Sequence, residues 1–141
     1  MESERNHMAE DRKFILRIIA PDRVFYEDEV EMVEFTTTEG EIGVLPGHIP
    51  MTVIVSPGIL TIHEPDGEKT AALHAGFAEI LPQQITILAE IIEWPEEIDQ
   101  NRAEASRQRA QERLHNHTPG IDMVRAEASL KRALARIEAL K

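Results

Sequence analysis

The hydrophobic pattern of the chain changes its period at Pro95. Between Lys13 and about Trp94, short β-branched and apolar segments alternate with turns that contain proline, glycine or aspartate, which is typical of the strands of an antiparallel sandwich or barrel. Beyond Pro95, apolar residues recur at the period of about 3.6 residues of an α-helix. Because each period is confined to one part of the chain, we predict an α+β fold: an N-terminal antiparallel β-sandwich followed by a C-terminal antiparallel α-helical hairpin.

The segment after Pro95 has the pattern of two helices. The first can begin at Pro95–Glu97, where proline and acidic residues suit a first turn, or at Asp99 as the N-cap. A short loop, His115–Gly120, leads to the second helix, so we expect the two helices to be antiparallel. The apolar stripes consist of Ala103, Ala110 and Leu114 in the first helix and of Met123, Ala126, Leu130, Ala133, Ile137 and Leu140 in the second. Stripes so rich in alanine form little core, and the hairpin must lean on another element or be mobile.

The charge of the chain divides at the same place. The formal net charge is -11, yet residues 96–141 carry 8 acidic and 9 basic side chains, whereas residues 1–95 carry 18 acidic and 6 basic ones. An acidic body argues against nucleic acid as its partner. We therefore predict a flexible polar tail over residues 1–12, a sandwich over residues 13–94 and a helical hairpin over residues 95–141.

The composition excludes several kinds of site. The chain contains no cysteine, which rules out disulfides, thiolate zinc sites and thiol catalysis. No stretch approaches the ~20 apolar residues of a membrane span, so any membrane association is expected to be peripheral, and no secretory signal is visible. The histidines at positions 48, 63 and 74 fall on separate strands or turns, and those at 115 and 117 fall in the hairpin loop. Without a pair spaced i,i+4 on a helix, they predict no metal site.

An enzymatic function finds little support in the residues. Glutamates crowd the segment Val24–Glu34, and paired carboxylates can perform acid–base chemistry. No nucleophile accompanies them, and the chain lacks the GxxxxGK[ST] motif that cradles phosphates in ATP-hydrolysing enzymes. An enzyme with a β-barrel fold is therefore the less favoured alternative, and we predict a chain that is not catalytic.

Arginines gather in the two helices of this acidic chain. Their spacing places Arg102, Arg109 and Arg113 on one face of the first helix, and Arg125, Arg132 and Arg136 recur in the second. In an antiparallel hairpin Arg102 lies opposite Arg132 and Arg136. Three guanidinium groups at one level repel each other unless an anion joins them, and a polyphosphate would form charge-assisted, bidentate bonds with them.

A solvated surface is the alternative interpretation of the same arginines. In that case each guanidinium would pair with a carboxylate of its own helix, for example Arg109 with Glu104 or Glu112. The residues alone leave both interpretations open.

The N-terminal part of the chain contains, in order, the segments VFYEDEVEMVEF, EGEIGVLPGHIP (Glu39–Pro50), HAGFAEI and ITILAE. In their order and spacing these segments resemble the ε subunit of F-type ATP synthases: the second resembles its signature turn and the others its strands. Further on, EEIDQNRA and AEASLKRALARI resemble the two C-terminal helices of bacterial ε subunits. The resemblance covers Phe14 to Leu140.

The resemblance implies a non-catalytic rotor subunit. It implies a sandwich that binds the γ subunit and the membrane ring of c subunits, with the complex peripheral at the cytoplasmic face of the cell membrane. It also implies a hairpin that restrains ATP hydrolysis when it extends toward the α and β subunits. Basic residues of the hairpin would then meet an acidic segment of β, with Arg113, Arg125, Lys131 and Arg132 as the candidates.

The resemblance further implies two sets of site residues. A motif of Ile/Leu-Asp, two residues and Arg-Ala, which binds ATP in some bacterial ε subunits, stands here as Ile98, Asp99, Arg102 and Ala103, and its partner positions are matched by Glu93, Arg109, Arg132 and Arg136. The contact with the c ring would involve Gly40, Glu41, Ile42, Gly43 and His48. ATP is thus expected as a regulatory ligand, with no cofactor required. A purely structural rotor connector that senses no nucleotide is the alternative.

Overall fold

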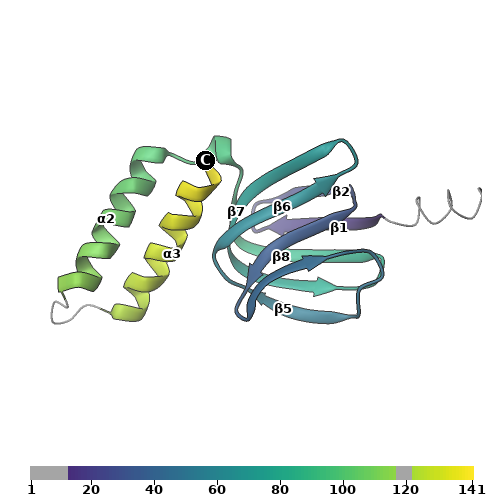
Figure 1. The fold of residues 1–141 in the computed structure, drawn as a ribbon, viewed down its shortest axis with the longest axis horizontal. Coiled ribbons are helices and arrows are strands. Elements are labelled where there is room, and N and C mark those ends of the chain that lie inside the picture. The colour runs from purple at the N-terminus through teal and green to yellow at the C-terminus, as the bar shows by residue number, and fades with distance from the viewer. Residues whose placement is uncertain (1–12, 117–121) are drawn as a thin grey trace, which may run out of the picture.

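The computed structural model describes residues 13–116 and 122–141 (Figure 1). The predicted tail, residues 1–12, and most of the predicted hairpin loop therefore lie outside the described residues. Figure 1 shows the strands gathered at one end of the molecule and the two helices side by side at the other, with α3 nearer to the strands than α2. The elements are β1 (Phe14–Ala20), β2 (Arg23–Val30), β3 (Met32–Thr37), β4 (Gly40–Val44), β5 (Met51–Val55), β6 (Gly58–Glu64), β7 (Gly67–Ile80), β8 (Gln84–Glu93), the 3-10 turn η1 (Pro95–Glu97), α2 (Gln100–Asn116) and α3 (Met123–Ala139).

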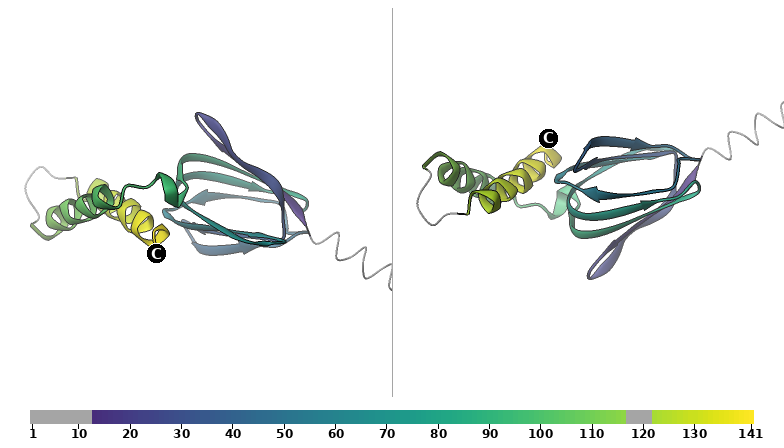
Figure 2. Two further views of the ribbon diagram at one scale, coloured as in Figure 1. Left: turned by 90° about the horizontal axis from the view of Figure 1, so that it is seen from above. Right: turned by 90° about the horizontal axis from the view of Figure 1, so that it is seen from below.

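The strands form two layers (Figure 2), and the long strand β7 belongs to both through its pairing with β5, β6 and β8. The first half of β7 pairs with β6 and its second half pairs with β5 and β8. All strand pairs are antiparallel except β1 with β8, which are parallel from Ile15 with Gln84 to Ile19 with Leu88. The predicted antiparallel sandwich followed by a helical hairpin is thus confirmed, with this one parallel pair as a difference. β1 and β8 are the first and the last strand in sequence, and no tight turn joins them, so they can pair in either direction.

Alternation along the strands builds the core between the layers. On β1, Leu16 and Ile18 are fully buried. Arg17 between them is half-buried, and Ile15 before them is exposed. Ile85 and Ile87 of β8 lie beside them in register and are buried on the same face. Because side chains of a strand point alternately to its two faces, this register brings both strands' apolar sets into one core.

The first helix begins at Asp99. The Asp99 Oδ1 accepts a hydrogen bond of 3.1 Å from the backbone N–H of Arg102, which is the geometry of an N-cap. The prediction that Pro95–Glu97 forms the first turn of this helix is therefore wrong: these residues form the separate turn η1, and Ile98 after them is extended. At its other end α2 continues to Asn116, so His115 belongs to the helix and not to the predicted loop.

Small residues bring the helices together and onto the sandwich. The alanines of the predicted stripes, Ala103, Ala110, Ala126 and Ala133, are buried, whereas the larger members such as Leu130 are half-buried. Ala135 is also buried although it lies outside the stripe. Its position two residues after Ala133 places it on another side of α3, and α3 packs against β6 and β7 as well as α2. The hairpin therefore leans on the sandwich through α3.

We predict that Gly76 of β7 is needed for the sandwich to fold. Its φ of 140° is in the left-handed region, and a Cβ atom there would lie 2.1 Å from the carbonyl oxygen of Leu88. Gly76→Ala should lower the free energy of unfolding by about 2–4 kcal/mol, measured by urea denaturation. Gly40→Ala is the matched control, since φ is 121° there and nothing lies within 4 Å; it should cost only about 1 kcal/mol. Equal losses would show that the backbone at Gly76 relaxes freely.

Candidate functional site

A cavity of about 300 Å³ lies where the end of β8, the turn η1 and the two helices meet. Its lining contains every predicted ATP-binding residue except Arg132. The lining residues are Glu93, Glu97, Ile98, Asp99, Arg102, Ala103, Ser106, Arg109 and Arg136. Glu97 and Ser106 were not predicted.

Chain geometry explains why residues so far apart in sequence meet here. Glu93 is the last residue of β8, and Ile98 and Asp99 are the extended link between η1 and α2. Arg102 and Arg109 are two turns apart on one face of α2. Because α3 runs antiparallel to α2, its last turn returns to the start of α2 and brings Arg136 to the cavity.

The arginines at the junction are mostly unneutralised. Arg136 Nε donates to Glu93 Oε1 at 2.7 Å. The guanidinium of Arg109 donates only to the hydroxyl of Ser106, at 3.1 Å, and that of Arg132 only to the hydroxyl of Ser129, at 3.2 Å, among the residues that the structure describes. Within the same residues the guanidinium of Arg102 has no hydrogen bond or ion pair. Three of the four predicted arginines therefore lack a carboxylate partner in this part of the chain.

The alternative in which Arg109 pairs with a carboxylate of its own helix is wrong in this structure. Glu104 pairs instead with Arg107, at 2.9 Å between its Oε2 and the arginine Nε, and Arg109 forms no ion pair with a described residue. The carboxylate of Glu104 is therefore bound by Arg107, its i,i+3 neighbour, which is half-buried. Arg109 is left directed at the cavity.

Glu93 has a second partner that the sequence analysis treated as an ordinary strand histidine. Nε2 of His74, on β7, lies 3.0 Å from Glu93 Oε1, and the His74 side chain is fully buried. Burial lowers the pKa of His74 to about 4, and Arg136 and then Arg132 act in the same direction, while Glu93 opposes them. His74 is therefore neutral at pH 7. No motif marks this residue, since its partners come from other elements.

The turn η1 is fastened to the sandwich by a second set of contacts. Arg23 of β2 donates to both carboxylate oxygens of Glu97, each at 2.8 Å, and the backbone N–H of Trp94 donates to Glu97 at 2.9 Å. The Arg23 bond in particular holds the pKa of the Glu97 carboxyl below its usual range. The ring of Trp94 stacks on Phe25 with 4.2 Å between centroids. Glu97 lines the cavity, but its charge is already balanced by Arg23.

The residues predicted to contact the c ring lie along one edge of the sandwich. Gly40, Glu41, Ile42 and Gly43 belong to β4, which among the described strands pairs with β3 alone. His48 follows in the loop before β5, and its Nδ1 lies 2.8 Å from the carbonyl oxygen of Ile49. Gly40 is near the end of β5 that pairs with Thr37, whereas His48 is near the opposite end of β5. The structure thus spreads these residues over the length of the edge.

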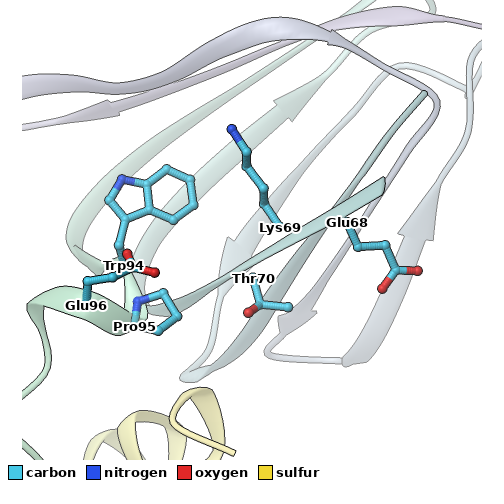
Figure 3. Close-up of a pocket in the computed structure, with 6 residues that line it drawn as sticks. All are labelled: Glu68, Lys69, Thr70, Trp94, Pro95 and Glu96. Atoms are coloured by element: carbon cyan, nitrogen blue, oxygen red, sulfur yellow. The ribbon is translucent and has the colours of Figure 1, made fainter. Parts of the chain in front are cut away.

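A second cavity, of about 440 Å³, lies on the sandwich side of the turn η1 (Figure 3). Figure 3 shows Glu68, Lys69 and Thr70 of β7 on one side of it and Trp94, Pro95 and Glu96 on the other. It contains none of the predicted site residues and no arginine, and it is more acidic. Although it is larger, its chemistry suits a polyphosphate less well than that of the junction cavity.

In residues 13–116 and 122–141, no three His, Asp or Glu side chains are grouped so that they could hold a metal ion. Neither of the helices described there is long and apolar enough to span a membrane.

Known proteins resemble this chain over nearly its whole length. It is 43% identical over 129 residues to the ATP synthase epsilon chain of Caldanaerobacter subterraneus, covering 91% of this chain and 94% of that protein. It is 38% identical to the epsilon chain of Bacillus licheniformis, covering 87% of this chain and 94% of that protein. Among solved structures, a chain of the Euglena gracilis mitochondrial ATP synthase has the same fold, with a TM-score of 0.81 at 23% identity over 92% of this chain and 82% of that one.

Family models match both parts of the chain. Residues 13–95 match the beta-sandwich domain of the ATP synthase delta/epsilon chain, and residues 96–141 match its long alpha-helix domain. Together the two matches leave only residues 1–12 uncovered. The chain therefore belongs to the delta/epsilon-chain family of ATP synthases, within which its relatives are the bacterial epsilon chains.

Proposed function

We propose that this chain is the ε subunit of the central stalk of a bacterial F-type ATP synthase, and that its hairpin is an ATP-sensitive brake on hydrolysis. The sandwich couples γ to the c ring, and the subunit itself is not catalytic. It lies at the cytoplasmic face of the cell membrane, held there by the complex. Family membership supports the place in the enzyme, and the junction cavity supports the nucleotide dependence.

The observation that carries the nucleotide site is a set of arginines without carboxylate partners at the junction. Arg102, Arg109 and Arg132 have no carboxylate partner among the described residues, and guanidinium groups bind phosphate oxygens with charge-assisted bonds. ATP phosphates placed between α2 and α3 would neutralise them. The adenosine would lie toward Ile98 and Ala103, while Asp99 caps α2 and thereby orients Arg102.

Such a ligand would hold the hairpin in the docked position. The cavity lining comes from β8, the link before α2, α2 itself and α3, so the complete site exists only while the hairpin is folded onto the sandwich. A ligand that binds one state only raises the population of that state as its concentration rises. ATP would therefore keep the brake released when it is plentiful.

When ATP leaves, the hairpin would extend along γ toward the α and β subunits. The candidate contacts with the acidic segment of β are Arg113, Arg125, Lys131 and Arg132. The first three are exposed in the docked hairpin, so docking onto the sandwich does not bury them. A connector that senses no nucleotide is the second candidate function, and nucleotide titration separates the two.

Exposed apolar residues suggest where γ would bind the sandwich. The register places Val24, Ile19, Leu88, Phe77 and Ile54 side by side across β2, β1, β8, β7 and β5. Four of them are among the large exposed hydrophobic residues, with Ile54 62% and Phe77 44% exposed. A continuous apolar row across five strands marks a surface for a protein partner. The c ring would meet the β4 edge with Gly40, Glu41, Ile42, Gly43 and His48.

ATP should bind the isolated chain with a Kd between ~1 μM and ~1 mM, because ordering the hairpin offsets part of the binding energy. Arg102→Ala should weaken binding about tenfold or more in calorimetric titration. Arg113→Ala is the matched control, since this exposed arginine of α2 lies outside the cavity, and it should bind ATP as the unchanged chain does. Millimolar ATP that produces neither heat nor a melting shift would favour the connector.

Deletion of residues 116–141 should raise the ATPase activity of the assembled enzyme several-fold and leave ATP synthesis unchanged. The reason is that the deletion removes α3, which carries most of the candidate contacts with β. Activity is measured on two preparations of the complex, one with the full-length and one with the shortened subunit, each containing the same amount of the subunit. Hydrolysis that stays equally low would assign the brake to another subunit.

Phe77→Ser and Leu88→Ser should each weaken binding to purified γ about tenfold, because each removes apolar area from the centre of the exposed row. Val124→Ser is the control: Val124 is 77% exposed but lies on α3, away from the sheet. Binding is measured by titration of labelled γ. A row variant with unchanged affinity would move the γ contact to another face.

A further inference from the structure

One oxygen of Glu93 joins three elements at the junction. His74 Nε2 of β7 lies 3.0 Å from Glu93 Oε1, and Arg136 Nε of α3 donates to the same oxygen at 2.7 Å. Among the described residues, the bond between Glu93 and Arg136 is the one side-chain hydrogen bond or ion pair that joins a strand to α2 or α3. The polar contact between the sandwich and the hairpin therefore depends on how Glu93 is held.

The neutral imidazole with its proton on Nε2 is the form of His74 that fits this site. A neutral ring with its proton on Nε2 donates to the carboxylate, and the lone pair of Nδ1 then needs no acceptor. Nδ1 is buried and has no hydrogen-bond partner in the part of the chain that the structure describes. A proton on Nδ1 would create a buried donor without an acceptor, which is costly.

The charges around His74 also disfavour a second proton. The groups that face it are Glu93 from β8 and Arg136 and Arg132 from α3. Glu93 already balances Arg136. A charged His74 would leave one carboxylate to serve several cations in a site that excludes water from the imidazole ring.

We propose that neutral His74 is the positioning residue of the junction: its Nε2–H fixes the Glu93 carboxylate toward Arg136, and the hairpin docks firmly only while His74 is uncharged. The inference concerns a contact present without nucleotide, so it does not require ATP binding. It makes docking of the hairpin depend on the protonation state of His74.

The direction of the pH dependence follows from the two states of His74. In the docked state the pKa is lowered to about 4. Detachment of α3 removes Arg136 and Arg132 and admits water, so the pKa rises toward its ordinary value of about 6.5. The detached state thus binds the proton more tightly. Docking is unaffected above about pH 7 and weakens as the pH falls from about 6.5 to about 4, by at most tenfold per pH unit.

The test follows docking in the full chain without nucleotide. Fluorescence energy transfer between labels at Thr52→Cys and Val124→Cys reports the distance between β5 and α3, and the chain has no other cysteine. The urea concentration is chosen so that about half of the hairpins are detached at pH 8, and circular dichroism verifies that the sandwich is still folded. The docking constant should fall by up to about 20-fold between pH 7 and pH 5.

Substitutions at His74 separate its two roles. His74→Gln keeps an N–H donor for Glu93 but cannot be protonated, so docking at pH 8 should persist and the decline toward pH 5 should disappear. His74→Leu removes the donor and should weaken docking at every pH. His63→Gln is the matched control, because His63 also contacts carboxylates, Glu34 and Glu68, but on the sandwich surface; it should keep the original profile.

A second measurement does not depend on the labels. In NMR titration of the imidazole, His74 of the unchanged chain should have a pKa well below the ordinary histidine value of about 6.5, and Arg136→Gln should raise it. An ordinary pKa for His74, or a His74→Gln variant that retains the pH-dependent detachment, would overturn the proposal. Failure of ATP to bind would leave both results unaffected and would refute only the nucleotide sensor.

Discussion

The contact of α3 with the sandwich is the constraint on which the arrangement of the site depends. The ion pair between Glu93 and Arg136 is partly exposed, with 26% and 28% of the two side chains accessible, and pairs of this kind contribute at most about 1 kcal/mol. The apolar contribution comes largely from alanines, which bury little area each. Docking of the hairpin is therefore weak compared with folding of the sandwich, whose core consists of fully buried leucine, isoleucine, valine and phenylalanine side chains.

Weak docking has a direct consequence for the site. The cavity is assembled from elements on both sides of the contact, so a modest binding energy is enough to change the population of the docked state. In the absence of an anion, the guanidinium groups of Arg102 and Arg109, which have no carboxylate partner among the described residues, repel one another across the same cavity. The unpaired positive charge at the junction thus also opposes its closure when no anion is present.

Much of this arrangement could be predicted from the sequence, since it depends on period and spacing. The change of period at Pro95 predicted the sandwich and the hairpin, and antiparallel helices necessarily bring Arg136 close to Arg102. Local patterns could not decide the rest. Proline followed by acids suits a 3-10 turn as well as a first helical turn, so the start of α2 at Asp99 required the structure. The rotation of α3 that keeps Arg132 out of the cavity lining was likewise not encoded in spacing alone.

His74 shows why some site residues have no sequence signal. It ends a run of four buried residues of β7, Ala71–His74. Its partners lie on other elements: Glu93 is 19 residues from His74, and Arg136 is 43 residues from Glu93. Only the pairing of β7 with β8 and the docking of α3 create its environment. The same circumstance makes it informative: a buried imidazole whose neighbours come from both sides of a weak contact experiences a different electrostatic field whenever that contact breaks. Its protonation and the position of the hairpin are therefore linked by thermodynamics, whatever ligand occupies the cavity.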